Sequence, residues 1–171
     1  MALYLVGFVP AAAAGASLAI LVTTTGLGLL ISSLWAAGIG QSMVSSVLGV
    51  FAGFWLSYSA LVLGLTHNWF GVVAADVTRT QELFLTAWCV TIFMLLIATL
   101  RLPSSFSLLF ALVDIALVLV LLGTINASSG LLKLAGIVVF AFVAVGFYLF
   151  VTVASIATGG KPLPLGRPIM S

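Results

Sequence analysis

Apolar residues occur along this chain in long runs that short polar segments interrupt. A first run, at residues 2–9, ends at Pro10 and is too short to cross a bilayer, which takes about 20 apolar residues in a helix. The longer runs that follow cover about residues 11–37, 43–66, 83–100, 105–122 and 131–157. The pattern therefore predicts five full membrane spans preceded by a partial first helix.

The polar segments between the runs mark the expected connections. They cover residues 38–42, 67–82, 101–103 and 123–130. Within lipid the backbone N–H and C=O groups have no water to bond, so a spanning segment must be a helix or part of a closed barrel. The sequence lacks the alternating strands of about ten residues that build a barrel. We therefore predict an all-α, polytopic transmembrane helical bundle at residues 1–158 and a C-terminal tail at residues 159–171.

The composition excludes several classes of function. The chain of 171 residues is 64% hydrophobic and 5% charged, whereas a water-soluble domain carries about 25% charged residues. Five basic and three acidic residues give no dense basic face, so a nucleic acid is not an expected partner. One cysteine and one histidine cannot build an intrachain disulfide or a zinc site, and no catalytic or nucleotide-binding motif is present. We expect no enzyme, no cofactor and no metal.

The few basic residues predict an orientation. If five spans follow the partial helix, Arg101, Lys161 and Arg167 fall on one side of the membrane, and Arg79 and Lys133 fall on the other. Cytoplasmic loops carry the excess of Lys and Arg, so the C-terminal tail is expected on the cytoplasmic side of the inner cell membrane. Membrane lipid is then an expected partner of the outer surface.

Small residues recur at every fourth position in two neighbouring runs. The stripes consist of Ser45, Gly49, Gly53 and Ser57 in the run 43–66, and of Thr24, Gly28, Ser32 and Ala36 in the run 11–37. At helical spacing each set lies on one face of its helix, so two backbones can approach closely. In lipid, where there is no hydrophobic driving force for helices to associate, such close packing holds them together. Such stripes either hold the helices of one bundle together or leave room for a narrow polar path.

One charged residue lies where no water is expected. Asp114 is near the middle of the run 105–122, and a charged side chain at the bilayer centre costs about 3 kcal/mol on insertion scales. The runs offer no basic partner except Lys133 near the start of the last one, and burial favours the neutral form of a carboxyl group. Asp114 is therefore expected to hold a proton part of the time. It is either a proton or substrate contact in a pathway or a hydrogen-bond partner of a neighbouring helix or subunit.

Aromatic residues cluster beside the stripe in the run 43–66. They are Phe51, Phe54, Trp55 and Tyr58. Aromatic side chains over a groove of small residues can form a constriction that excludes water, although such a cluster is also typical of ordinary packing. The Tyr58 hydroxyl needs a hydrogen-bond partner when it is buried.

Several segments of the chain are similar to one known family. GVFAGFWLSYSAL at 49–61 resembles a family segment close to SYGSFWLS, and GQS at 40–42 lies where that family commonly has Gly-Asn-Thr. ATLRLPSS at 98–105, LLGTINASSGLLKLAG at 121–136 and KPLPLGRP at 161–168 resemble its fourth-to-fifth turn, its fifth-to-sixth turn and its ending. The segments cover nearly the whole chain in order. The family is that of the acetate uptake transporters, or succinate–acetate permeases, of the YaaH type.

The resemblance implies six helices, a central pore within each subunit and a ring-shaped homo-oligomer, commonly a hexamer. It also implies passage of acetate or another small carboxylate. The first helix of the family begins with Asn-Pro-Ala-Pro-Leu-Gly-Leu. Nothing like this motif precedes Ala2, so the chain is expected to start within that helix.

The resemblance further implies a constriction made by three residues. The family's Phe in the first helix would lie before Met1, its Tyr in the third helix falls at Phe51, and its Leu in the fifth helix falls at Val113. The ring keeps its apolar character but loses one hydroxyl. Asp114 departs from the apolar or hydroxyl residue that is usual in the family at its position.

These observations lead to one hypothesis and two alternatives. The hypothesis is a membrane transporter or channel for acetate or a similar small carboxylate, linked to a proton, with Asp114 beside an apolar neck at Phe51 and Val113 and with Tyr58 in the same pathway. One alternative is a membrane scaffold or accessory subunit that transports nothing. The other is a channel for small neutral solutes.

Overall fold

The structure, a computed structural model, describes residues 1–10, 13 and 15–170. Among these residues, five helices are long and apolar enough to cross a membrane. They cover Gly15–Gly38, Ser42–Thr66, Ala74–Thr99, Ser104–Ile125 and Ser129–Ala157. The prediction of an all-α bundle with five spans is confirmed. The short first run forms only the helix α1, Ala2–Leu5.

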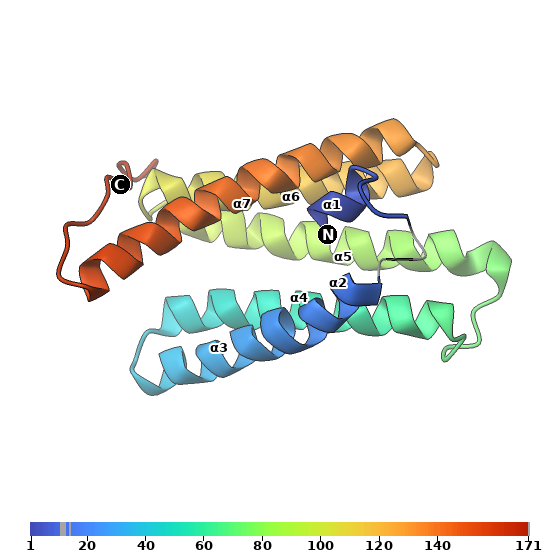
Figure 1. Cartoon of the computed structure of the whole chain (residues 1–171), viewed down its shortest axis with the longest axis horizontal. Coiled ribbons are helices and arrows are strands. Elements are labelled where there is room, and N and C mark those ends of the chain that lie inside the picture. The colour runs from blue at the N-terminus through green and yellow to red at the C-terminus, as the bar shows by residue number, and fades with distance from the viewer. Residues whose placement is uncertain (11–12, 14, 171) are drawn as a thin grey trace. The chain divides into compact units, whose positions relative to one another are not determined.

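The chain divides into two compact units. Unit 1 comprises residues 1–8 and 78–171, and unit 2 comprises residues 9–77. Unit 2 contains one long helical hairpin, whereas unit 1 contains α1 and the last three long helices of the chain (Figure 1).

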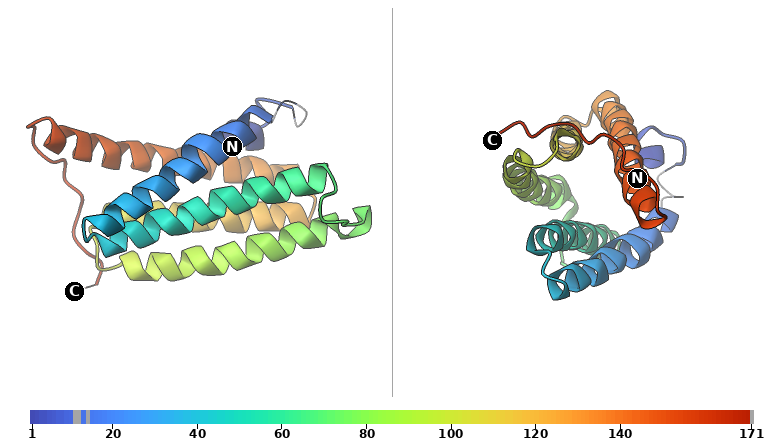
Figure 2. Two further views of the ribbon diagram at one scale, coloured as in Figure 1. Left: turned by 90° about the horizontal axis from the view of Figure 1, so that it is seen from below. Right: turned by 90° about the vertical axis from the view of Figure 1, so that its left-hand side faces the viewer.

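The hairpin of unit 2 is formed by one composite helix and one regular helix. The composite helix consists of α2 (Gly15–Ile20), a π-helical stretch (Leu21–Leu27) and α3 (Gly28–Gly38). The chain then reverses at Gly40, whose positive φ of 76° suits a residue without a side chain. The second arm is α4 (Ser42–Thr66), and both views of Figure 2 show it alongside the composite helix.

Small residues allow the two arms of the hairpin to approach closely. A Cβ atom on Gly26, in the π-helical stretch, would lie 2.6 Å from Cδ2 of Leu56 on α4. Two turns further along the same face, the Ser33 hydroxyl donates to the Ser45 carbonyl oxygen at 2.8 Å, and a Cβ on Gly49 would lie 3.1 Å from Ser33 Oγ. Close backbone approach and a hydrogen bond between helices therefore hold this hairpin together.

Unit 1 pairs α6 (Ser104–Ile125) with α7 (Ser129–Ala157) in antiparallel orientation. A Cβ on Gly123 would lie 2.8 Å from Leu132, and a Cβ on Gly146 would lie 4.0 Å from Leu109. The short α1 packs on α7 at Gly136, where an added Cβ would meet Val6 at 2.8 Å. The remaining long helix of this unit is α5 (Val77–Thr99).

Two connections are shorter in the structure than the polar pattern predicts. The segment 67–82 was expected to be a connection, but a 3₁₀ turn at Ala74–Asp76 leads into α5 at Val77, so Arg79 and Glu82 belong to a helix. A helix of 23 residues is about 35 Å long, more than the hydrocarbon thickness of about 30 Å, so its first turn reaches the headgroups, where polar side chains are stable. The segment 123–130 is likewise mostly helical, and only residues 126–128 separate α6 from α7.

Residues 159–170 cross one end of unit 1, and we call them the tail strap (Figure 2). The backbone N–H groups of Ile169 and Met170 both donate to the Leu100 carbonyl oxygen at 3.0 Å. The Ser105 N–H donates to the Leu165 carbonyl oxygen at 3.1 Å. The strap is therefore bonded to the turn between α5 and α6. Its predicted cytoplasmic location stays a prediction.

The α7 helix also holds the tail strap. The Tyr148 hydroxyl donates to the Pro164 carbonyl oxygen at 2.6 Å, and the Ser155 hydroxyl donates to the Lys161 carbonyl oxygen at 2.8 Å. The strap thus ties the C-terminal part of α7 to the start of α6 through side-chain and backbone hydrogen bonds.

Candidate functional site

Most hydroxyl groups of the long helices bond to their own backbone. Ser59 donates to the Trp55 carbonyl oxygen, Thr91 to that of Ala87 and Thr124 to that of Val120, at 2.8 to 2.9 Å. Each bond reaches the residue four positions earlier. The hydroxyl group therefore has an acceptor on its own helix and needs none from another helix, even within lipid. These side chains therefore need no further partner.

In its ionised form, Asp114 cannot donate a hydrogen bond to the carbonyl oxygen of its own helix, as these hydroxyl groups do. Its side chain is 9% exposed on α6, and its Oδ1 atom is buried without a hydrogen-bond partner among the described residues. An ionised carboxylate only accepts hydrogen bonds, and the N–H groups in the middle of a helix already donate to backbone carbonyls. Asp114 is therefore a buried polar group that its own helix cannot satisfy, which is costly in lipid.

The face of α6 that carries Asp114 differs from the face that packs on α7. Ser107, Phe110 and Leu117 lie three or four positions apart along the Asp114 face, and all three are buried. The Ser107 hydroxyl donates to the Thr99 carbonyl oxygen of α5 at 2.9 Å. The contacts with α7 instead come from Leu109 and Gly123. Asp114 thus lies on the face of α6 that carries the Ser107 bond to α5, not on the face that packs on α7.

Three residues of the aromatic cluster predicted from the sequence pack together on α4. The rings of Phe54 and Trp55 meet edge to face with centroids 4.7 Å apart, and Tyr58 lies 6.2 Å from Phe54 and 6.4 Å from Trp55. Phe54 is buried, whereas Phe51 and Tyr58 are half-buried. Phe51 and Tyr58 are seven positions apart, so they lie on the same face of the helix.

The residues predicted for the pathway are divided between the two units. Phe51 and Tyr58 belong to unit 2, and the half-buried Val113 and the buried Asp114 belong to unit 1. Val113 and Asp114 are adjacent on α6 and point about 100° apart around its axis. The constriction that would join Phe51 to Val113 stays a prediction.

The predicted packing residues have varied surroundings within unit 2. Ser45 and Gly49 contact Ser33, and the Ser57 hydroxyl donates to the Phe54 carbonyl oxygen at 3.0 Å. A Cβ on Gly28 would have no heavy atom within 4 Å, and both Ser32 and Gly53 are exposed. The packing role of Gly28, Ser32 and Gly53 stays a prediction.

Sequence reasoning missed two residues at the contact between the arms of the hairpin. Gly26 and Ser33 are buried small residues that contact α4, and they are seven positions apart, whereas Ala36 of the predicted stripe is also buried. The prediction followed a spacing of four from Thr24, which assumes a regular α-helix. A search for small residues at a spacing of seven, or two turns, would have found both.

The five long apolar helices place the protein in the class of multi-pass helical membrane proteins. A model of the GPR1/FUN34/yaaH family matches residues 1–161, so the chain belongs to this family. The resemblance to acetate uptake transporters of the YaaH type is thereby confirmed.

Comparison with individual proteins gives the same fold. A solved structure entitled "Structure of the bacterial acetate channel SatP" superposes with a TM-score of 0.82 at 22% identity, and the match covers 96% of this chain and 89% of that chain. Two relatives come from Saccharomyces cerevisiae. Accumulation of dyads protein 2 is 28% identical over 84% of this chain and 50% of its own length, and Ammonia transport outward protein 2 is 27% identical over 70% and 44%. This chain spans half or less of the length of these relatives.

Proposed function

We propose that the protein is a membrane transporter or channel for acetate or a similar small carboxylate. Membership of the family and the likeness of the fold to the bacterial acetate channel support this function. A bare carboxylate ion cannot cross hydrocarbon without a large cost, so it requires a protein path. The observation that carries the proposal is the buried Asp114 with an unpartnered Oδ1 in the middle of a span.

Asp114 links the passage of the substrate to a proton in this proposal. In its ionised form the side chain repels a carboxylate, whereas in its protonated form it donates a hydrogen bond to one. Acidification raises the protonated fraction of a carboxyl group and so favours the form of Asp114 that donates. Uptake should therefore be faster at acidic than at neutral pH.

The apolar neck of the pathway is formed by Phe51 and Val113 in this proposal. The family resemblance is the basis of this assignment, and both side chains are half-buried. Tyr58 lies two turns after Phe51 on the same face of α4. In this proposal its hydroxyl lies along the same pathway. An apolar constriction next to an ionisable group favours the neutral acid over the free anion.

Uptake of labelled acetate by the purified protein in liposomes tests this function. The wild-type protein should take up acetate faster at acidic pH, and the Asp114→Asn variant should lose this response because its amide does not ionise. The matched control is Asp76→Asn, which removes an exposed carboxylate before α5. If Asp114→Asn leaves both the rate and the pH response unchanged, the role of Asp114 is wrong.

A channel for a small neutral solute is the second candidate. The name of one relative, Ammonia transport outward protein 2, favours it. A buried carboxylate can also accept a hydrogen bond from a nitrogen donor. Swelling of liposomes in uncharged solutes and in ammonium salts separates this candidate from an acetate carrier. If neither acetate nor a neutral solute passes, the protein is better explained as a scaffold or accessory subunit.

We further propose that the chain works as a homo-oligomer, a hexamer by analogy with its family, in the inner cell membrane. Its C-terminal tail would lie on the cytoplasmic side, because Arg101, Lys161 and Arg167 outnumber the cations at the other ends of the spans. Mass measurement of the purified protein in detergent tests the subunit number, and protease protection of the tail in sealed vesicles tests the orientation.

A further inference from the structure

Three cations gather at the end of unit 1 that the tail strap crosses. Lys161 and Arg167 lie on the strap, Arg101 lies in the turn between α5 and α6, and all three side chains are exposed. The strap pairs with this turn through Pro168 and Pro103 and through the two bonds to the Leu100 carbonyl oxygen. The hydrogen bonds of the strap thus bring the cations of two distant parts of the sequence to one surface.

Among the described residues of unit 1, no carboxylate side chain lies near this surface. Its three acidic side chains are Asp76, Glu82 and Asp114. Glu82 and Arg101 are separated by nearly the whole of α5 and lie about 28 Å apart along its axis. Asp114 is ten positions into α6 and is buried. The cations of the strap surface therefore face their surroundings without an acidic partner in unit 1.

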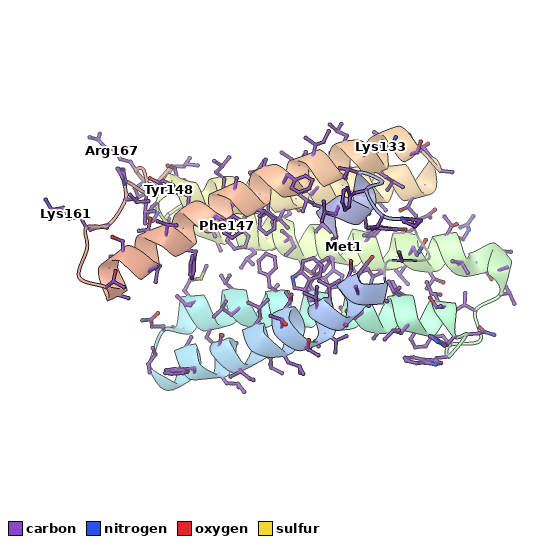
Figure 3. The ribbon with its side chains drawn as sticks, in the orientation of Figure 1. Met1, Lys133, Phe147, Tyr148, Lys161 and Arg167 are labelled. Carbon is purple, nitrogen blue, oxygen red and sulfur yellow. The ribbon has the colours of Figure 1, made fainter. Side chains whose placement is uncertain are left out.

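Apolar side chains lie next to these cations. Ile169 is 63% exposed and Met170 is 49% exposed, and both follow Arg167 on the strap. Tyr148 lies on α7 beneath the strap and bonds to it through its hydroxyl. Figure 3 shows Tyr148, Lys161 and Arg167 at one end of unit 1, and Lys133 toward the other end of α7. A soluble polyanion would leave the apolar side chains in water, whereas the headgroup region of a membrane accepts both kinds of group.

We propose that the tail strap and the turn between α5 and α6 form a binding surface for the phosphate headgroup of an anionic phospholipid. The cations contact the phosphate, and Ile169 and Met170 enter the edge of the acyl region. The surface lies where three spans end, at Thr99, Ser104 and Ala157, which is the level at which headgroups are found. Arg101 and Arg167 also offer guanidinium groups, which bind phosphate oxygens in pairs.

The test uses the purified full chain in a neutral detergent. The temperature of unfolding is measured while phosphatidylglycerol or phosphatidylcholine is added. Phosphatidylglycerol should raise the unfolding temperature of the wild-type protein by several degrees and phosphatidylcholine should not, and high salt should remove the effect. The variant Arg101→Gln/Lys161→Gln/Arg167→Gln should lose the response, with an apparent affinity for the lipid about 100-fold lower, or about fivefold for each cation.

Matched variants separate a lipid site from a general charge effect. Arg79→Gln/Lys133→Gln removes the cations outside the strap surface and should keep the full response. Arg101→Lys/Arg167→Lys keeps the charges and should keep most of it. If the triple variant does not fold, Arg167→Gln alone, at an exposed side chain, should still reduce the affinity about fivefold. The proposal is overturned if the strap variants respond like the wild type, if the control loses the response equally, or if inorganic phosphate alone produces the same shift.

Discussion

The two units of the chain differ in whether their buried polar atoms on Ser33, Ser107 and Asp114 have hydrogen-bond partners. In unit 2 the hydroxyl that reaches between helices, on Ser33, has a bond of 2.8 Å to the Ser45 carbonyl oxygen. In unit 1 the Ser107 hydroxyl is bonded to α5 in the same manner, but Oδ1 of Asp114, two turns further along α6, has no partner among the described residues. Contacts between helices account for the Ser33 and Ser107 hydroxyls, and they do not account for Oδ1 of Asp114.

Under the proposed function, this difference corresponds to a division of roles between the units. A buried polar atom without a partner lowers stability, so it persists where it serves another purpose. Unit 2 would then provide a rigid hairpin with an aromatic surface, and unit 1 would provide the ionisable group. Four substitutions test this comparison through the free energy of unfolding of the purified protein in detergent, and they are ordered by the size of their expected effects.

The largest effect is expected at the close contact of unit 2. Gly26→Ala adds a Cβ that lies 2.6 Å from Leu56 Cδ2 and 2.9 Å from the Leu21 carbonyl oxygen, and the latter belongs to the backbone and cannot rotate away. We expect the free energy of unfolding to fall by about 3 kcal/mol, since overpacking commonly costs 1–3 kcal/mol. Denaturant titration followed by circular dichroism measures the change.

The control for this substitution lies two positions further along the same composite helix. Gly28 has open space at its Cβ position, so Gly28→Ala should be neutral or stabilising by up to about 1 kcal/mol, the gain in helix propensity. Equal losses for both variants would show that the hairpin does not depend on the contact at Gly26.

The second effect has the opposite sign and concerns unit 1. Asp114→Asn replaces one carboxylate oxygen with an NH2 group, which can donate to the carbonyl oxygen four residues earlier, as the NH2 of Asn126 does to Leu122 at 2.8 Å. We expect the free energy of unfolding to rise by about 2 kcal/mol, since an unsatisfied buried polar group costs about 1–3 kcal/mol. The matched control is Glu82→Gln, in the first turns of α5, which should change it by less than about 0.5 kcal/mol. A loss of stability in Asp114→Asn would show that the carboxyl group has a stabilising partner, and the proposed role of Asp114 would lose its basis.

The third effect tests the hydrogen bond between the arms of unit 2. Ser33→Ala removes the donor to the Ser45 carbonyl oxygen and should lower the free energy of unfolding by about 1 kcal/mol. Ser32→Ala is the control, because the exposed Ser32 hydroxyl bonds only to the Gly28 carbonyl oxygen of its own helix. A larger loss at Ser32 than at Ser33 would mean that the stripe containing Gly28 and Ser32 packs against another surface, as the sequence pattern predicts.

The sequence predicts the spans well because the length of an apolar run directly reflects the thickness of the membrane. It predicts their ends less well. Polar residues such as Arg79 and Glu82 lie in the first turns of α5, at a depth where water and headgroups satisfy them, so polarity does not mark the start of the helix. Asp114 could be found from the sequence because a single charge stands out in an apolar run.

Two features could not be predicted from the sequence, for different reasons. The π-helical stretch at Leu21–Leu27 changes which residues face α4, so the regular spacing that led to Ser32 missed Ser33. The tail strap is held largely through backbone atoms, such as the carbonyl oxygen of Leu100, which every residue type has. No residue type therefore marks where the strap binds, and the surface that it forms with Arg101 emerges only in three dimensions.

The smallest effect concerns the strap that unit 1 has and unit 2 lacks among the described residues. Tyr148→Phe removes the hydroxyl that donates to the Pro164 carbonyl oxygen at 2.6 Å. Since Tyr148 is 38% exposed, water can replace part of this bond, and we expect a loss of about 0.5 kcal/mol. The loss should be local, so the backbone N–H groups of Ile169 and Met170 should exchange with deuterium about twice as fast, while those in the middle of α4 keep their rates. Phe147→Leu, at the neighbouring exposed position, should leave the strap unchanged. If Tyr148→Phe slows or does not alter exchange at Ile169 and Met170, the strap is held by the turn between α5 and α6 alone, and its hold on α7 does not contribute to the cationic surface.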